Sequence, residues 1–235
     1  MEATSLKRGE WDASHSRGEN NIFYPQTEVV RFLNQFIAKR NTLYKTTYKI
    51  EAQGRALRCL DFACGIGTHA IICKDFGIKA YGVDISEHAL SLARDHAIAK
   101  GQSDLAERFS LIDNEDQKLN FEDGFFDFVI AEACLDSMPF AQAMRYMDEL
   151  KRITRRKIYF SAVSAEFSNG AVGDTVVETR HEEGTIQSYF DVPQLEKLAS
   201  RPAKDFDYLQ HTSQVDIVSG KLRGARYHCV IDVSA

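Results

Sequence analysis

A glycine-containing loop at residues 63–67 is the feature that most restricts the fold of this chain. It lies between a predicted buried strand at 56–63 and a predicted helix at 68–76. Gly65 and Gly67 let the backbone come close to a ligand, and the free N–H groups at the start of the helix point toward that ligand. The loop therefore predicts a ligand site inside a β-α-β unit.

Strands and helices continue to alternate after this loop. The predicted strands lie at residues 79–83, 108–112, 125–133 and 157–163. The helices between them run from an N-cap at Ser86 to about residue 100 and over 140–153. This order indicates right-handed crossovers and a parallel sheet that is covered on both faces.

The rhythm changes after residue 164. Residues 176–189 read as polar strands or a loop, and 192–199 as a short helix. The segments 211–218 and 225–233 are rich in β-branched residues and have no long helix between them, which predicts an antiparallel edge hairpin. The expected fold is α/β, with a doubly wound, mostly parallel seven-stranded sheet.

An acidic residue follows the second strand of the β-α-β unit. Asp84 ends that strand, and the topology places its carboxylate across the strand tips from the loop. A carboxylate in this position can accept both hydroxyls of a ribose. The alternative is a tight turn beside a solvated aspartate, but the strand, loop and helix around Asp84 favour a nucleoside site.

The segment LDFACGIGTHA, residues 60–70, is similar to the first motif of class I S-adenosylmethionine-dependent methyltransferases of the small-molecule type. The matching positions are Asp61, Ala63, Gly65 and Gly67, with Ala63 in place of the first glycine of Asp/Glu-x-Gly-x-Gly-x-Gly. Cys64 lies inside the motif. The resemblance covers roughly residues 55–165.

The resemblance implies a role for several further residues. Asp84 is expected on the ribose hydroxyls and Ile85 against the adenine. Asp113 and Asn114 would also meet the adenine, although Glu115 is an alternative acid at this position. Glu132 would lie near the cofactor, at the end of the strand over 125–133.

The N-terminal segment resembles the lids of small-molecule methyltransferases. Trp11 and Tyr24 would close over cofactor and acceptor, or would pin the arm to the core. A helix with an N-cap at Thr27 is predicted to follow. We expect an arm with lid helices over residues 1–46 and one methyltransferase domain over 47–235.

The implied reaction is in-line methyl transfer to a small-molecule acceptor, in which the enzyme contributes mainly positioning and exclusion of water. The candidates for a catalytic base are Asp136, His15 and, more weakly, His181. Asp136 could instead cap a helix, while His15 and His181 could be surface residues.

Two other functions stay open at this point. The residues CGIGTHA also fit the Gly-x-Gly-x-x-Ala loop of NAD-linked oxidoreductases with a Rossmann fold. Asp61 at the end of its strand, together with the segments at 113–116 and 121–130, argues against a dinucleotide. A catalytically silent module that binds the cofactor is the third possibility.

Composition narrows the range of partners. The net charge is −5 and the pI is about 5.8, so a broad basic surface for nucleic acid is not expected. The sequence has no long apolar run and no apolar leader, which predicts no membrane partner. The five cysteines include no C-x-x-C and do not cluster with histidines, which favours reduced thiols in the cytoplasm and no metal. The sequence makes no prediction of the oligomeric state.

Overall fold

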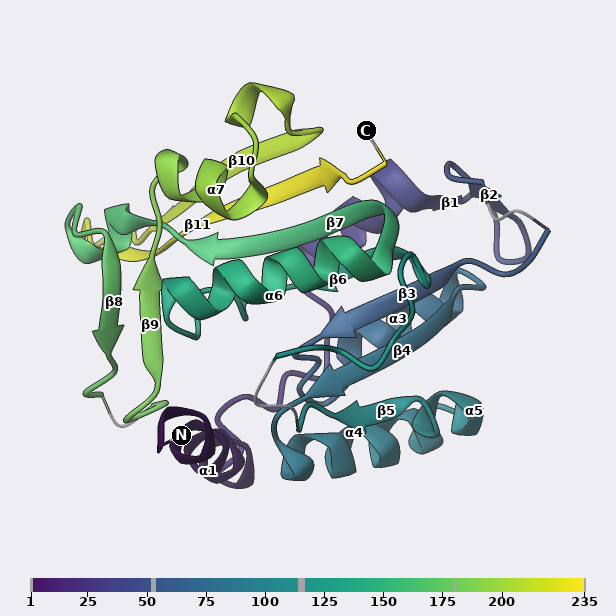
Figure 1. The fold of residues 1–235 in the computed structure, drawn as a ribbon, viewed down its shortest axis with the longest axis horizontal. Helices are drawn as coiled ribbons and strands as arrows, with labels where there is room; N and C mark the ends of the chain where they lie inside the picture. The colour runs from purple at the N-terminus through teal and green to yellow at the C-terminus, as the bar shows by residue number, and fades with distance from the viewer. Residues whose placement is uncertain (1, 52–53, 114–116, 180, 235) are drawn as a thin grey trace.

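The computed structural model describes residues 2–51, 54–113, 117–179 and 181–234. Within these residues, the main sheet has seven strands in the order β10-β11-β7-β6-β3-β4-β5 (Figure 1). The strands are β3 (Arg58–Phe62), β4 (Lys79–Asp84), β5 (Phe109–Leu111), β6 (Phe126–Ala131), β7 (Thr154–Val163), β10 (Tyr208–Val215) and β11 (Leu222–Asp232).

The strand directions confirm the predicted topology. β5, β4, β3, β6 and β7 are parallel neighbours, so their carboxyl ends share one edge. β11 is antiparallel to both β7 and β10. The sheet is therefore mostly parallel and ends in an antiparallel hairpin. The order reverses at β3, because β4 and β6 lie on its two sides, and a ligand crevice is expected at such a point.

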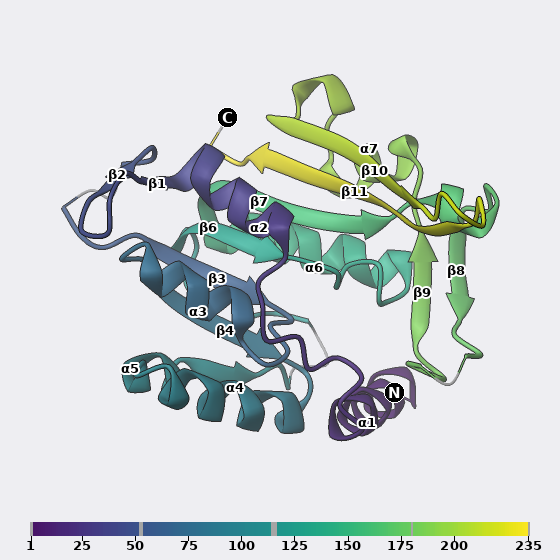
Figure 2. The same ribbon diagram turned by 180° about the vertical axis from the view of Figure 1, so that it is seen from behind.

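Helices cover both faces of the sheet. α6 (Phe140–Ile153) and α7 (Val192–Ala199) pack on one face. The other face carries α2 (Thr27–Phe32), the π-helix η1 (Leu33–Ile37), α3 (Thr68–Asp75) and α4 (Glu87–Ala99) (Figure 2). Consecutive residues of β3 alternate between the two cores, with Leu60 and Phe62 on the α6 side and Cys59 on the α3 side.

The two predicted helix caps have different outcomes. Ser86 is the N-cap of α4, and its hydroxyl accepts a hydrogen bond from the Ala89 N–H at 3.0 Å, as expected. The cap at Thr27 is wrong, because Thr27 is the first residue of α2. Gln26 occupies the N-cap position and makes no side-chain cap bond.

Smaller elements surround the sheet. They are α1 (Glu2–Ser16), β1 (Ala38–Arg40), β2 (Thr46–Tyr48), α5 (Ser103–Ala106), η2 (Ala165–Ser168), β8 (Gly173–Val176), β9 (Ile186–Tyr189) and η3 (Ala203–Asp205). β1 pairs with β2, and β8 pairs with β9. The β1–β2 hairpin was not predicted and spans residue 46, whereas β8–β9 lies where polar strands or a loop were expected. The division of the chain at residue 46 stays a prediction.

Two further expectations concern the thiols and the membrane. All five cysteines are free and buried in the structure, in agreement with the predicted reduced thiols. None of the helices in the described part of the chain has the length and apolar character required to cross a membrane.

Candidate active site

The loop after β3 carries a left-handed backbone at three positions. The φ angles are 53° at Ala63, 52° at Gly65 and 77° at Gly67. At Gly67 a Cβ atom would lie 2.7 Å from the Cζ atom of Phe109, so this glycine lets the backbone before α3 approach the Phe109 ring of β5. At Gly65 the same atom would lie 3.5 Å from the Cε1 atom of His15. The two glycines therefore have different functions. Gly67 allows close packing against Phe109, whereas Gly65 leaves room for His15 of the N-terminal helix.

Asp84 connects this loop to the end of β4. Its carboxylate accepts the Gly65 N–H at 2.8 Å and the Ser86 N–H at 2.9 Å. The side chain is buried, and this burial raises the pKa of the Asp84 carboxyl above its ordinary value, against the lowering effect of the backbone hydrogen bonds. Each carboxylate oxygen has a further lone pair, so the group can still accept ligand hydroxyls.

Asp61 orients helix α3 from beneath. Its carboxylate accepts the Ala70 N–H at 2.9 Å and lies 3.7 Å from the Nδ1 atom of His69. Asp61 is 1% exposed. Burial lowers the pKa of His69, but the neighbouring Asp61 outweighs this effect and raises it. In the described structure, Asp61 is thus a buried residue that binds the first turn of α3 through the Ala70 N–H.

A cavity of about 270 Å³ opens at the carboxyl ends of β3, β4 and β6. Nine of the predicted site residues line it, namely Trp11, His15, Tyr24, Ala63, Cys64, Gly65, Asp84, Ile85 and Glu132. In the part of the chain that the structure describes, Asp61, Gly67, Asp113 and Asp136 are not among the lining residues. Asn114 and Glu115 lie outside the described residues.

Helix α1 forms one side of this cavity and is attached to the rim. Arg8 donates a hydrogen bond from Nη2 to the Asp113 carboxylate at 2.8 Å. The Asp12 carboxylate accepts the Ser86 hydroxyl at the start of α4. Figure 1 shows α1 beyond the carboxyl ends of β3 and β4. The predicted adenine ligand Asp113 is therefore paired with α1, and its contact with adenine stays a prediction.

The loop between β8 and β9 closes the cavity from another direction. The Glu19 carboxylate accepts the Ser14 hydroxyl at 2.9 Å and the Glu182 N–H at 3.2 Å. Glu182 and Gln187 line the cavity, although no sequence motif had pointed to them. His181 lies in this loop with an exposed imidazole, 3.5 Å from Glu182 Oε1, and is not among the described lining residues.

His15 presents an unsatisfied polar atom to the cavity. The residue is 5% exposed, and its Nδ1 atom has no hydrogen-bond partner in the described part of the chain. A buried polar atom without a partner is costly, and a ligand with a polar group would supply one. The position of His15 over Gly65 and near Asp84 fits a nucleoside-type ligand in this crevice.

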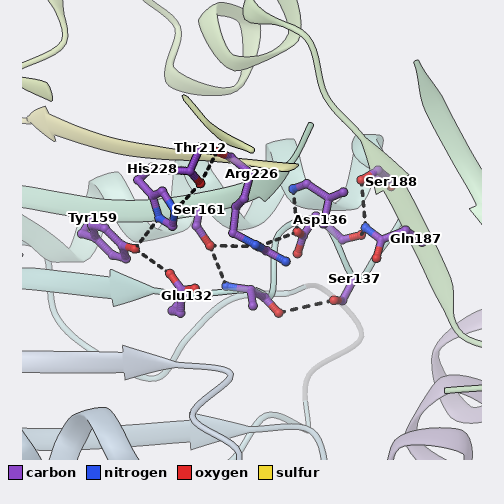
Figure 3. A network of polar contacts seen from close by, with 12 residues as sticks. Glu132, Asp136, Ser137, Tyr159, Ser161, Gln187, Ser188, Thr212, Arg226 and His228 are labelled. Carbon is purple, nitrogen blue, oxygen red and sulfur yellow. Dashed lines mark hydrogen bonds and ion pairs between the residues drawn. The ribbon is translucent and has the colours of Figure 1, made fainter. Parts of the chain in front are cut away.

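A chain of hydrogen bonds holds Glu132 at the end of β6. The Tyr159 hydroxyl donates to Glu132 Oε2 at 2.6 Å and lies 3.0 Å from the Nδ1 atom of His228 (Figure 3). Since the single phenolic proton goes to Glu132, the bond from His228 is donated by Nδ1–H. Burial raises the pKa of Tyr159 and lowers the pKa of His228, so the hydroxyl stays protonated and the neutral imidazole is favoured.

Asp136 is held in a second polar cluster. Its carboxylate accepts the Val163 N–H at 2.8 Å and Nη1 of Arg226 at 2.8 Å. The same Nη1 donates to the Ser161 hydroxyl oxygen at 3.0 Å, as Figure 3 shows. Asp136 is 1% exposed, whereas Arg226 lines the cavity. The geometry thus brings Arg226 to the ligand space and leaves Asp136 behind it.

Arg226 was missed by the sequence analysis. It belongs to β11, and 90 positions separate it from Asp136 in the chain. One signal was present, because Arg226 is a cation inside the segment 225–233, which was predicted to be a strand rich in β-branched residues. Sequence spacing could not show which loop this cation faces.

Comparisons with known proteins agree with this arrangement. Residues 60–161 match the family model described as a methyltransferase domain. An uncharacterized protein of Haemophilus influenzae is 36% identical over 99 residues, which cover 42% of this chain and 38% of that protein. The chain thus spans little more than a third of this curated relative.

Solved structures share the fold over most of the chain. A methyltransferase structure from Methanosarcina mazei has a TM-score of 0.60 at 20% identity and covers 75% of this chain and 92% of its own. The 1,6-didemethyltoxoflavin-N1-methyltransferase of Burkholderia thailandensis, crystallised with its namesake compound and S-adenosylhomocysteine, has a TM-score of 0.62 at 14% identity and covers 97% and 87%. Residues 60–161 of the chain therefore match a methyltransferase domain, and the chain shares the fold of these methyltransferase structures.

Proposed function

We propose that this chain transfers the methyl group of S-adenosylmethionine to a small-molecule acceptor by in-line displacement at the methyl carbon. The observation that carries this proposal is the shared cavity. Asp84 and the backbone of Gly65 line the same space as Glu132 and Arg226. A nucleoside end and an acceptor end can therefore lie next to each other, away from bulk water.

The residues at the nucleoside end fit the donor. Asp84 would accept the ribose hydroxyls, Ile85 would pack against the adenine, and the backbone of residues 63–65 would hold the methionine portion. Glu132, fixed by Tyr159, would accept the ammonium group. The donor supplies a methyl group on a sulfonium, whose departure as a neutral thioether needs no protonation.

His15 and Asp136 receive different roles. His15 remains the candidate base, because its unpaired Nδ1 atom belongs to a lining residue. The buried Asp136 is proposed as a positioning residue that acts through Arg226. Trp11 and Tyr24 would close over the ligands from the N-terminal segment.

The size of the acceptor is inferred from the two segments that cover the cavity, helix α1 and the loop after β8. Helix α1 is bonded to the rim at Asp113 and Ser86, and the loop after β8 meets the end of α1 through Glu19. A partly covered space of this kind favours a small acceptor over a nucleic acid or a folded protein.

Calorimetric titration with S-adenosylhomocysteine and with NAD tests the donor. We expect saturable binding of S-adenosylhomocysteine and none of NAD. The reverse result would support the oxidoreductase and refute the proposal. Release of S-adenosylhomocysteine from S-adenosylmethionine across a broad panel of acceptors separates an active enzyme from a silent binding module, which would bind the nucleoside without turnover.

A further inference from the structure

We infer that Arg226 binds a carboxylate group of the acceptor, so that the substrates of this site are organic acids. The inference rests on the proposed function and adds a substrate class to it. Among the described residues that line the cavity, Arg226 is the one with a lysine or arginine side chain. Its guanidinium extends from β11 across β7 toward the loop after β6 (Figure 3).

The hydrogen bonds of Arg226 leave one edge of the guanidinium available to a ligand. In the described structure, its bonds to Asp136 Oδ2 and to Ser161 Oγ both use Nη1. The Nε and Nη2 atoms carry three further N–H groups on the adjacent edge. Two parallel N–H groups of this kind match the two oxygens of a carboxylate and form a bidentate pair with it.

The orientation of Arg226 is fixed before any ligand arrives. Asp136 is buried and also accepts the Val163 N–H, so its carboxylate cannot turn away from the guanidinium without leaving that N–H unpaired. The Arg226 side chain is 27% exposed. A cation that is held in place in this way loses little conformational entropy when it binds an anion.

The charge around Arg226 favours a monoanion over a dianion. Burial lowers the pKa of Arg226, but the nearby Asp136 and Glu132 outweigh this effect and raise it. A phosphate monoester would bring nearly two negative charges toward these two acids, whereas a carboxylate brings one. The single guanidinium therefore fits a carboxylate.

The acceptor end also contains apolar side chains. Phe62, Met138 and Tyr146 line the cavity beside the polar cluster. The rings of Phe62 and Tyr146 lie 4.9 Å apart between centroids. An acid with an aromatic or aliphatic body would place its carboxylate on Arg226 and its body against these side chains.

The test uses matched acids and amides with the full chain saturated with S-adenosylhomocysteine. The pairs are 4-hydroxybenzoate with 4-hydroxybenzamide, indole-3-acetate with indole-3-acetamide, and octanoate with octanamide. Phenyl phosphate serves as the dianion. Calorimetry should show at least one acid binding about 10-fold or more tighter than its amide, as expected of a charge-assisted bidentate pair.

Three variants assign the effect to its residue. Arg226→Gln should remove the preference for the acid, and Arg226→Lys, which keeps the charge without the fork, should weaken it. Arg223→Gln is the matched control, because Arg223 is also on β11 but is exposed and paired with Asp216. Circular dichroism reports that each variant is folded, and Arg223→Gln should keep both the affinity for S-adenosylhomocysteine and the preference for the acid.

Several results would overturn the inference. They are equal binding of acids and amides, no binding of any acid, tighter binding of phenyl phosphate, or a preference that survives Arg226→Gln. A chain that fails to bind S-adenosylhomocysteine would instead refute the proposed function, so the two failures are distinguishable.

Discussion

The two ends of the cavity are built in different ways. The nucleoside end comes from one β-α-β unit, in which the loop after β3 and Asp84 at the end of β4 are close in sequence. The acceptor end combines Glu132 after β6, Arg226 on β11 and Gln187 on β9. A contiguous motif can fix the donor, whereas the acceptor depends on side chains that distant segments bring together.

The largest expected effect tests whether the acceptor end is also a structural element. Asp136→Ala would leave the half-buried Arg226 without its carboxylate and the Val163 N–H without an acceptor. We expect the free energy of unfolding to fall by about 3–5 kcal/mol. Urea denaturation measures it, with Arg223→Ala, which breaks an ion pair on the surface, as a control expected to lose less than about 1 kcal/mol. A loss within that control range would contradict the role of Asp136.

The next effect tests the nucleoside end. Asp84→Ala removes the acceptor proposed for the ribose hydroxyls, so the dissociation constant of S-adenosylhomocysteine should rise about 10- to 100-fold. Calorimetry provides the measurement. Asp75→Ala removes an exposed acid of α3 and should leave the affinity unchanged. An Asp84→Ala protein with wild-type affinity would disprove the assignment.

The pH dependence of binding gives a smaller effect at the same residue. Because burial raises the pKa of Asp84, this carboxyl takes up its proton at a higher pH than an ordinary aspartate. The ionised form is the acceptor, so the affinity for S-adenosylhomocysteine should fall as the pH is lowered through that pKa. The titration belongs in a His15→Gln background, since His15 lies close enough to Asp84 to influence its charge. In that background, Asp84→Asn should flatten the curve, and a persistent slope would assign it to another group.

Tyr159→Phe tests the hydrogen-bond network between the nucleoside end and the acceptor end of the cavity. It removes the hydroxyl between Glu132 and His228, and both lose a buried partner. We expect a loss of about 1–2 kcal/mol in the free energy of unfolding. Tyr44→Phe is the control, because Tyr44 is 97% exposed and should be neutral. Equal stability of the two variants would show that the network contributes nothing.

The smallest effect concerns Ala63, which replaces the first glycine of the motif. Its φ of 53° strains an alanine, and glycine relieves this strain while making the unfolded chain more flexible. Ala63→Gly should therefore raise the free energy of unfolding by up to about 1 kcal/mol. Ala70→Gly, at a helical position of α3, should lower it. A decrease for both variants would show that Ala63 is not strained.

Sequence periodicity was sufficient for the sheet and for most of its covering helices. The strand–loop–helix order located β3, α3 and β4, and the late β-branched segments located the edge hairpin. The β1–β2 hairpin was missed because its two strands are short and their residues are mostly polar and largely exposed. The capping residue of α2 was misassigned by one position, which is a typical limit of boundaries read from sequence.

The residues of the candidate site also divide into those that a contiguous motif could locate and those that it could not. Gly65, Asp84 and Ile85 line the cavity, because their positions follow from the crossover, and their contact with the cofactor stays a prediction. The motif did not separate Gly67, which allows close packing against Phe109, from Gly65, which lies beneath His15. The position of Arg226 beside the cavity could not be predicted, since its partner Asp136 comes from a loop far away in the chain.

The attachment of α1 to the rim has a consequence for the timing of turnover. A nucleoside that enters or leaves beneath this helix would require the bonds of Asp12 to Ser86 and of Glu19 to the Glu182 N–H to break. The residence time of the ligand would then depend on the departure of α1 as well as on the interaction with Asp84. The undocking of the N-terminal helix would thereby limit the rate at which S-adenosylhomocysteine is released.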